Sequence, residues 1–224
     1  MDKRSTNPLS IRDCGLMAYR DALDLQKELV EKLQKNKIPN TVLIVEHKPV
    51  ITQGARKSEN KILASKETLA QKGIEVASVR RGGGTTAHNP GQIVLYPILN
   101  LQLLRLGVNE YIRELEAIGA ELLEQYGIKS ERKTKYPGLW IGEKKIASIG
   151  VKIKKWITFH GMAININNDL GIFETIVPCG LENVKITNLS KQTNKEISMN
   201  QVKQKLAKLC AEHFSSEGLV SYES

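Results

Sequence analysis

The sequence predicts an α+β fold in which helices pack against a mostly antiparallel or mixed sheet. Three observations support this prediction. Apolar residues recur at helical spacing in three long segments, at 18–35, 108–126 and 200–214. Short apolar, β-branched segments lie between these helices, and those after residue 138 are separated by tight turns. No internal repeat, low-complexity tract or linker divides the 224 residues, so we expect one domain over 1–224 with its core at about 41–190.

The N-terminal part of the chain contains a strand, a helix and a second strand. After a polar start, Leu9–Asp13 is expected to form a short strand. Ala18–Lys35 has one apolar face and is predicted to be a helix that packs on the core and ends before Pro39. Thr41–Glu46 is apolar on both faces, which is typical of a central strand. The residues after His47 are predicted to form a loop.

The next segment, residues 65–99, contains a short helix and two strands on either side of a glycine-rich loop. Ser65–Lys72 is predicted to be a short helix that Ser65 caps and Gly73 ends. Ile74–Arg80 is a predicted strand that leads into the loop, and Ile93–Leu99 is an apolar, β-branched strand that follows it.

The second half of the chain adds two helices and three strands. Val108–Tyr126 is predicted to be a helix that ends at Gly127, and the last helix covers about Asn200–Phe214. Three short β-like segments are expected to pair in an antiparallel manner, namely Leu139–Ile141, Lys145–Ile153 and Ile157–Ile166.

Composition restricts the classes of partner. The formal charge of +9 and the pI of about 9.4 favour an acidic partner, although a merely solubilising surface charge is an equal alternative. Nucleic acid has weak support, since only 5% of residues are aromatic and no basic run alternates with stacking side chains. No apolar run has the length of a membrane span and no secretory signal opens the chain, so we expect a cytoplasmic protein that binds neither nucleic acid nor membrane.

The cysteines argue against a disulfide framework or a zinc cluster. Cys14, Cys179 and Cys210 are scattered and odd in number, so reduced thiols are expected. Cys14 and Cys210 have apolar neighbours and are interpreted as core residues. Cys179 stands between Pro178 and Gly180, which predicts a turn, and its context favours a reactive thiol.

The glycine-rich loop is interpreted as one wall of a binding pocket. Three consecutive glycines allow a ligand to lie directly against the main chain. A long, flexible hairpin is the alternative, but such a hairpin rarely combines its glycines with His, Asn-Pro and Gln. The polar residues that this loop would present are Arg81, Thr85, Thr86, His88 and Gln92.

A reactive thiol needs a neighbouring cation or general base. The candidates are Lys145, at the start of an apolar strand, and the histidines His88 and His160. Spacing in the sequence does not choose between a Cys-Lys and a Cys-His pair.

Four motifs in order resemble the lipoyl(octanoyl) transferases. They are R-G-G-G-T-T-A-H-N-P-G-Q, G-E-K-K-I-A-S-I-G, F-H-G-M-A-I-N-I-N and V-P-C-G, and the similarity covers about Leu43 through Thr187. The resemblance implies the catalytic-domain fold of the biotin and lipoate protein ligases. It also implies transfer of an octanoyl group from the phosphopantetheine thioester of acyl carrier protein to a specific lysine of a lipoyl domain.

The resemblance further implies roles for individual residues. Cys179 corresponds to the acyl-accepting nucleophile and Lys145 to the lysine that lowers the pKa of that thiol, with His160 in a supporting position. The acyl-binding residues would be Arg81, Gly82, Gly83, Gly84, Thr85, Thr86, Ala87, His88, Ser148, Ile149, Gly150, Gly161, Met162 and Ala163. No ATP, metal or other cofactor is implied. The donor would be octanoyl-acyl carrier protein. The acceptors would be the lipoyl domains of dehydrogenase E2 subunits and the glycine cleavage H protein. The enzyme would be a monomer.

Two residues depart from the family pattern, and three other functions compete. Asn89 stands where the family usually has glycine, and Trp156 occupies a turn that is usually smaller. An ATP-dependent lipoate or biotin protein ligase would share the fold, but a lipoate ligase would continue H-D-x-G-N after the glycines and needs no cysteine nucleophile. A lipoyl amidotransferase would share the cysteine chemistry. A nucleic-acid-binding module would explain the charge but none of the motifs.

Overall fold

A mixed sheet forms the centre of the fold. The structure is a computed structural model that describes residues 8–134, 136–178, 184–215 and 220–223. The strands run in the order β12-β9-β10-β7-β2-β1-β13, and β8 also pairs with β9. Pairing is parallel for β1 with β2 and β13 and for β12 with β9, and antiparallel elsewhere in this sheet. The strands are β1 (Leu9–Met17), β2 (Asn40–His47), β7 (Gln92–Ile98), β8 (Gly138–Ile141), β9 (Lys144–Lys154), β10 (Ile157–Asn165), β12 (Lys185–Ile186) and β13 (Val220–Glu223).

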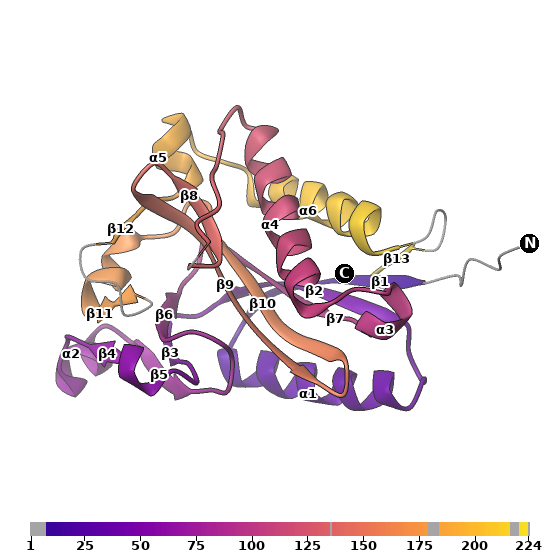
Figure 1. Cartoon of the computed structure of the whole chain (residues 1–224). Helices are drawn as coiled ribbons and strands as arrows, with labels where there is room; N and C mark the ends of the chain where they lie inside the picture. The colour runs from indigo at the N-terminus through magenta and orange to yellow at the C-terminus, as the bar shows by residue number, and fades with distance from the viewer. Residues whose placement is uncertain (1–7, 135, 179–183, 216–219, 224) are drawn as a thin grey trace, which may run out of the picture.

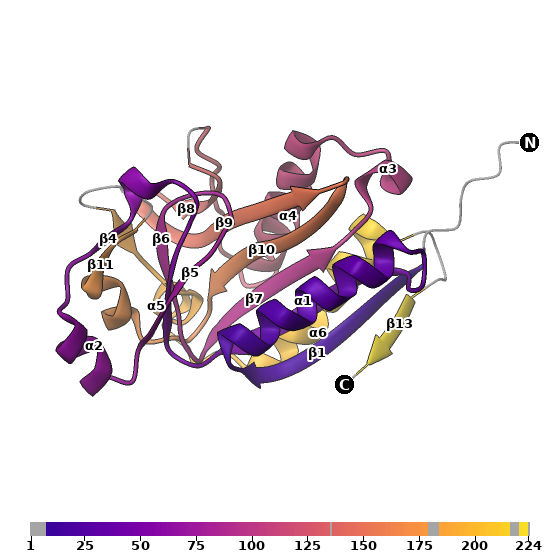
Figure 2. The ribbon, with the colours of Figure 1, turned by 90° about the horizontal axis from the view of Figure 1, so that it is seen from below.

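Helices cover both faces of this sheet, as Figures 1 and 2 show, so the predicted α+β fold with a mixed sheet and flanking helices is confirmed. Helix α1 (Tyr19–Gln34) packs on one face, and α4 (Val108–Glu124) and α6 (Met199–Phe214) pack on the other. The short helices α3 (Leu101–Leu104) and α5 (Leu189–Thr193) lie at the ends of strands. Among the described residues, no helix is long and apolar enough to cross a membrane.

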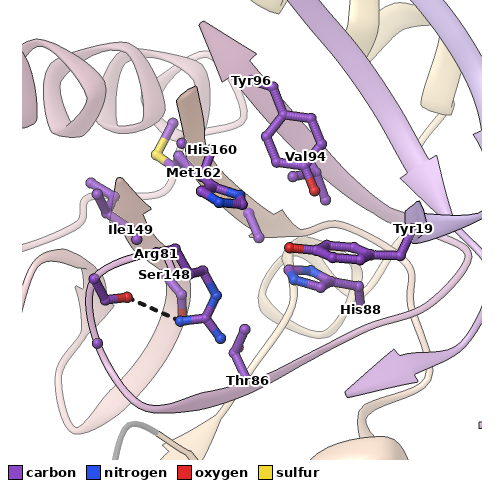
Figure 3. A pocket seen from close by; sticks show the side chains of 15 residues that line it. Tyr19, Arg81, Thr86, His88, Val94, Tyr96, Ser148, Ile149, His160 and Met162 are labelled. Carbon is purple, nitrogen blue, oxygen red and sulfur yellow. Dashed lines mark hydrogen bonds between the residues drawn. The ribbon is translucent and has the colours of Figure 1, made fainter. Parts of the chain in front are cut away.

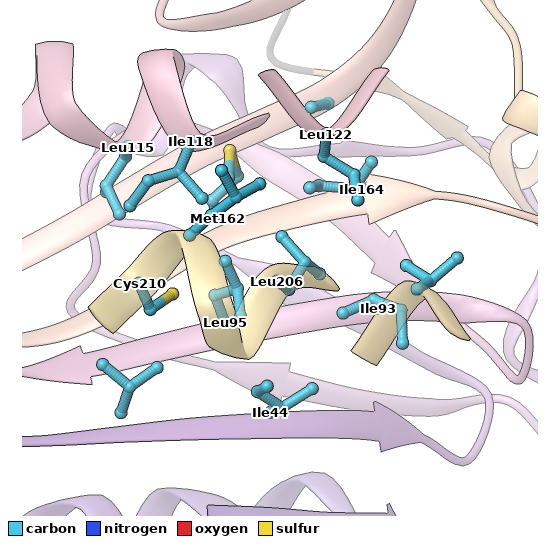
Figure 4. Packing of buried hydrophobic residues seen from close by; sticks show 14 of the residues in the cluster. Ile44, Ile93, Leu95, Leu115, Ile118, Leu122, Met162, Ile164, Leu206 and Cys210 are labelled. Carbon is cyan, nitrogen blue, oxygen red and sulfur yellow. The ribbon is translucent and has the colours of Figure 1, made fainter. Parts of the chain in front are cut away.

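The central strand β2 contributes side chains to two separate hydrophobic cores, because alternate side chains of a strand point to opposite faces. Val42 and Ile44 belong to the large cluster beneath α4 and α6, part of which Figure 4 shows. Leu43 and Val45 belong to the smaller cluster beneath α1. This arrangement confirms the prediction of a strand that is buried on both faces.

A second, three-stranded sheet lies at one end of the main sheet. It has the order β5 (Glu75–Ser78), β3 (Val50–Gln53) and β6 (Thr85–His88). Close to it lie the smaller elements η1 (Lys57–Glu59), β4 (Lys61–Ile62), α2 (Lys66–Gln71), η2 (Leu170–Thr175) and β11 (Ile176–Val177). In α2 the hydroxyl of Ser65 accepts a hydrogen bond from the Thr68 N–H at 3.2 Å, so the predicted cap is confirmed.

Two loop predictions were wrong at this small sheet. The residues that follow His47 form β3, and Thr85–His88, which had been included in the glycine-rich loop, form β6. β6 pairs with β3 in an antiparallel register, and all four of its residues are buried. Its polar side chains concealed the strand, because the partner strand supplies the backbone hydrogen bonds that decide its conformation.

The remaining loop, residues 79–84, is anchored from both sides. Ala55 N donates to Arg81 O at 2.9 Å and Arg56 N to Gly83 O at 3.2 Å, while Gly82 N donates to Val151 O on β9 at 2.9 Å. These hydrogen bonds hold the glycines against the outer edge of the main sheet, so the loop is a fixed wall.

Candidate functional site

A pocket lies where the glycine loop, the N-terminus of α1 and strands β6, β7, β9 and β10 meet, and Figure 3 shows its side chains. We call it the central pocket. Its lining contains every predicted acyl-binding residue except Gly84, Thr85 and Ala87, together with His160. Three separate chain segments therefore converge on one site. The lining residues are Tyr19, Arg81, Gly82, Gly83, Thr86, His88, Val94, Tyr96, Ser148, Ile149, Gly150, His160, Gly161, Met162 and Ala163.

Arg81 fixes the glycine wall from inside the protein. Its side chain is buried, and its guanidinium donates to the hydroxyl of Thr52 at 2.7 and 3.2 Å, to Thr52 O at 2.8 Å and to Gly82 O at 3.0 Å. A guanidinium bound in this way has a defined orientation. The buried cation also contributes to keeping nearby histidines neutral, because it lowers the pKa values of His88 and His160.

The three histidines at or beside the pocket are neutral at physiological pH. Burial is the largest cause in each case, and it lowers the pKa of His47 to about 4 and those of His88 and His160 to about 3. His160 has a left-handed backbone with φ of 57°, and its N–H donates to the buried Gln26 side chain at 2.8 Å. Since a thiolate is favoured by a nearby positive charge, these neutral rings are poor partners for one.

A hydrogen-bond network sets the tautomer of His88. Gln92 Nε2 donates to Asn165 Oδ1 at 2.8 Å and to Ala87 O at 3.3 Å, so Gln92 Oε1, 2.6 Å from His88 Nδ1, is the acceptor of a His88 N–H. The Nε2 atom of His88 is then an acceptor. The network continues from Asn165 Nδ2 to Thr187 O at 3.0 Å and from Thr187 N to Lys145 O at 2.9 Å. It therefore joins the pocket to the backbone of Lys145.

Sequence reasoning missed the aromatic end of the pocket. Tyr19 stacks on His88 with ring centroids 6.0 Å apart and an interplanar angle of 10°. Tyr96 donates from its hydroxyl to His47 Nε2 at 2.7 Å, since His47 Nδ1 faces Met17 O at 3.1 Å. Tyr19 and Tyr96 lie in a helix and a strand whose sequence patterns predict core residues. Only the packing of α1 beside β7 brings them to this site.

Lys145 lies in a second cleft that adjoins the central pocket. We call it the lysine cleft. It shares Gly82, Gly83, Ile149 and Gly150 with the central pocket. Its lining consists of Arg56, Gly82, Gly83, Ile112, Tyr136, Pro137, Lys145, Ile149, Gly150 and Val151. Lys145 is only 3% exposed, and its Nζ lies 5.2 Å from the centre of the Trp140 ring.

Cys179 lies outside the described residues, so its distance to Lys145 stays a prediction. Further along the chain, Ile186 pairs with Lys145 in the parallel register of β12 and β9. Cys14 and Cys210 are free thiols, and burial raises the pKa of both, for Cys210 to about 12. At both positions burial therefore favours the neutral thiol over the thiolate. Within the described ranges no group of three or more His, Cys, Asp or Glu side chains could hold a metal ion.

Comparison with known proteins identifies the family. A model of lipoyl protein ligase A/B catalytic domains matches residues 18–211. The octanoyltransferase of Clostridium kluyveri is 42% identical over 191 residues, which cover 85% of this chain and 82% of that protein. The octanoyltransferase of Caldicellulosiruptor saccharolyticus is 41% identical over 204 residues, which cover 90% and 87%.

Solved structures share the fold at low sequence identity. A lipoate-protein ligase A bound with ATP superposes with a TM-score of 0.70 at 15% identity, covering 98% of this chain and 88% of that one. A bipartite lipoate protein ligase from Thermoplasma acidophilum gives a TM-score of 0.70 at 14% identity, covering 98% and 86%. The predicted ligase-type fold is thus confirmed, and the chain belongs to the lipoyl protein ligase A/B catalytic-domain family.

Proposed function

We propose that this protein is an octanoyltransferase that moves an octanoyl group from acyl carrier protein, through a thioester on Cys179, to a lysine of a lipoyl domain. The observation that carries the proposal is the junction of the two cavities. Lys145 lines the lysine cleft and the acyl-binding motifs line the central pocket, and the two cavities share the glycine segments 82–83 and 149–150. A carbonyl at this junction would lie beside Lys145 while its alkyl chain entered the pocket.

The first half-reaction exchanges one thioester for another. The Cys179 thiolate, which the Lys145 ammonium favours, attacks the donor carbonyl; the bond to the pantetheine sulfur breaks, and the departing thiolate takes a proton from Lys145. The products are octanoyl-Cys179, the donor thiol and a neutral Lys145 amine. The energy change is small because one thioester replaces another.

The second half-reaction forms an amide. The neutral amine of the acceptor lysine attacks octanoyl-Cys179, Lys145 takes one proton from that nitrogen, and Cys179 leaves as a thiolate. The Cys179–Lys145 ion pair is restored. Because an amide is more stable than a thioester, this step drives the cycle without ATP.

The charge of the chain suits the proposed donor. Its formal charge of +9 would steer an acidic carrier protein toward the site. The acceptors would be lipoyl domains of dehydrogenase E2 subunits and the glycine cleavage H protein. We further propose that the enzyme acts as a monomer in the cytoplasm, with 1–224 as one catalytic domain.

The proposal predicts a covalent intermediate. After incubation with octanoyl-acyl carrier protein and no ATP, intact-protein mass spectrometry should find one octanoyl group that hydroxylamine removes. Cys179→Ser should abolish this adduct, whereas Cys14→Ser, a matched control at a thiol whose pKa burial raises, should retain it. An adduct that persists in Cys179→Ser would refute the assignment of the nucleophile. Acyl-adenylate formation from ATP and free octanoate, without a thioester, would instead favour the ligase alternative.

The role of Lys145 has a separate test. Lys145→Ala should slow alkylation of Cys179 by iodoacetamide at pH 7, because the thiolate loses its cationic neighbour. His88→Gln is the comparison, since the neutral His88 ring should contribute little to the thiolate. Equal slowing in both variants would contradict a specific role for Lys145. Circular dichroism should confirm that both variants are folded.

A further inference from the structure

The lysine cleft extends beyond the residues that it shares with the central pocket. In the proposed reaction an acyl chain would lie in the central pocket, and Lys145 lies in the lysine cleft together with side chains that do not line that pocket. With the acyl chain in the central pocket, the leaving thiol of the donor would lie toward the lysine cleft. Whatever group carries that thiol has to lie along the cleft walls.

Among the described residues, these walls combine apolar surface with an exposed cation. Ile112 of α4, Pro137 and Val151 of β9 supply aliphatic surface, and Tyr136 is 38% exposed beside them. Arg56 is the exposed cation that lines the cleft. Such a lining suits a narrow, branched, largely uncharged chain that ends in an anion.

The backbone of Arg56 is held at the glycine wall. Its N–H donates to Gly83 O at 3.2 Å, and the preceding Ala55 N–H donates to Arg81 O at 2.9 Å. Gly54 lies so close that a β-carbon there would be 2.1 Å from Gly83 O. The Arg56 side chain therefore extends from a backbone whose position is fixed. Guanidinium groups bind phosphate with two parallel hydrogen bonds.

We propose that the lysine cleft binds the 4′-phosphopantetheine arm of the donor and that Arg56 binds its phosphate. This inference rests on the proposed octanoyl transfer and adds a binding site for the leaving group. The branched dimethyl part of the arm would contact Ile112, Pro137 and Val151, and the sulfur would lie at the Lys145 end. The phosphate would lie toward solvent, where the carrier protein is attached.

Small donors with and without the phosphate test Arg56. In the wild type, kcat/KM for octanoyl-4′-phosphopantetheine should exceed that for octanoyl-pantetheine by about fivefold, the size of effect that one partly exposed ion pair supplies. Arg56→Ala should reduce this ratio to near one, and Arg56→Lys should restore part of it. The control is Lys208→Ala, which removes one exposed positive charge from α6 and should keep the full ratio.

The outcomes separate the inference from the proposed function. A ratio near one in the wild type, or a full ratio in Arg56→Ala, would overturn the phosphate site even though transfer itself occurs. If the wild type transfers octanoyl from neither donor nor from octanoyl-acyl carrier protein, the proposed function fails and the inference fails with it.

Ile112→Trp tests the route of the phosphopantetheine arm, because the larger side chain should fill the lysine cleft and raise KM for both small donors. If Ile112→Trp leaves KM unaltered for both donors, the phosphopantetheine arm does not bind in the lysine cleft.

Discussion

Of the glycines that line both cavities, Gly150 has the least space for a side chain. It lines both of them, and a β-carbon there would lie 2.9 Å from Gly82 O and 3.1 Å from Arg81 Cδ. Only hydrogen at this position allows the glycine loop to lie against β9. The hydrogen bond from Gly82 N to Val151 O, at 2.9 Å, depends on the same close approach.

We therefore expect Gly150→Ala to displace the loop rather than unfold the protein. The glycine wall that the two cavities share would shift by a few tenths of an ångström, and kcat/KM should fall by at least about tenfold, since small misplacements at a reacting centre are costly. Gly107→Ala is the control, because its β-carbon meets only the flexible Glu110 side chain at 3.1 Å. Transfer assays and thermal unfolding of both variants check this. Full activity in Gly150→Ala would show that the glycine loop can move away from β9 without any loss of kcat/KM.

At the scale of elements, the β9–β10 hairpin contains a local conflict between sequence and geometry. Its two turn residues, Lys155 and Trp156, have φ of 50° and 64°, the left-handed region that favours Gly or Asn in such turns. Trp156 is 47% exposed, so its burial offsets little of this strain.

Trp156→Gly should therefore raise the free energy of unfolding by about 0.5–1 kcal/mol. Trp156→Ala is the matched control, because it removes the same ring but keeps a β-carbon in the left-handed conformation. Urea denaturation of the three proteins gives the comparison. If the two variants have equal stability, relief of backbone strain is not the cause of any change.

Elements with a strong periodic pattern could be predicted from the sequence, and elements defined by their partners could not. The helices at 19–34, 108–124 and 199–214 and the antiparallel β8, β9 and β10 follow the predicted segments closely. Strand β6 was missed because its residues are mostly polar, and β13 was missed because the strand with which it pairs, β1, begins more than 200 residues earlier. Hydrogen bonds to distant strands leave no local signature.

At the scale of the whole molecule, the site depends on contacts between segments that are far apart in the chain. The motifs indicated which segments meet, and the structure does bring residues from the segments 81–88, 148–150 and 160–163 to one pocket, although Gly84, Thr85 and Ala87 do not line it. They gave no sign of Tyr19 or Tyr96, whose positions depend on the packing of α1 beside β7. The pairing of Cys179 with Lys145 stays a prediction, because Cys179 lies outside the described ranges.

Three buried histidines make the stability of the whole fold depend on pH. The folded pKa values, about 4 for His47 and about 3 for His88 and His160, lie below the ordinary value of 6.5 that the unfolded chain would have. Below pH 6.5 the unfolded state binds more protons than the folded state. The stabilisation is therefore complete above pH 6.5 and is lost as the pH falls toward the folded values.

Linkage sets the expected size of this loss at roughly 1 kcal/mol for each histidine per pH unit between about pH 6 and 4, or roughly 3 kcal/mol per unit for all three. Urea denaturation at pH 7.5, 6.5, 5.5 and 4.5 measures the slope. His47→Gln keeps a donor for Met17 O and an acceptor for the Tyr96 hydroxyl, so the variant should fold and lose about a third of the slope. An unchanged slope would mean that the folded protein accepts a proton at His47 as readily as the unfolded chain does. In that case burial beside Tyr96 would not exclude the charge at His47, and the pH dependence would have to come from His88 and His160, whose own burial lowers their pKa values.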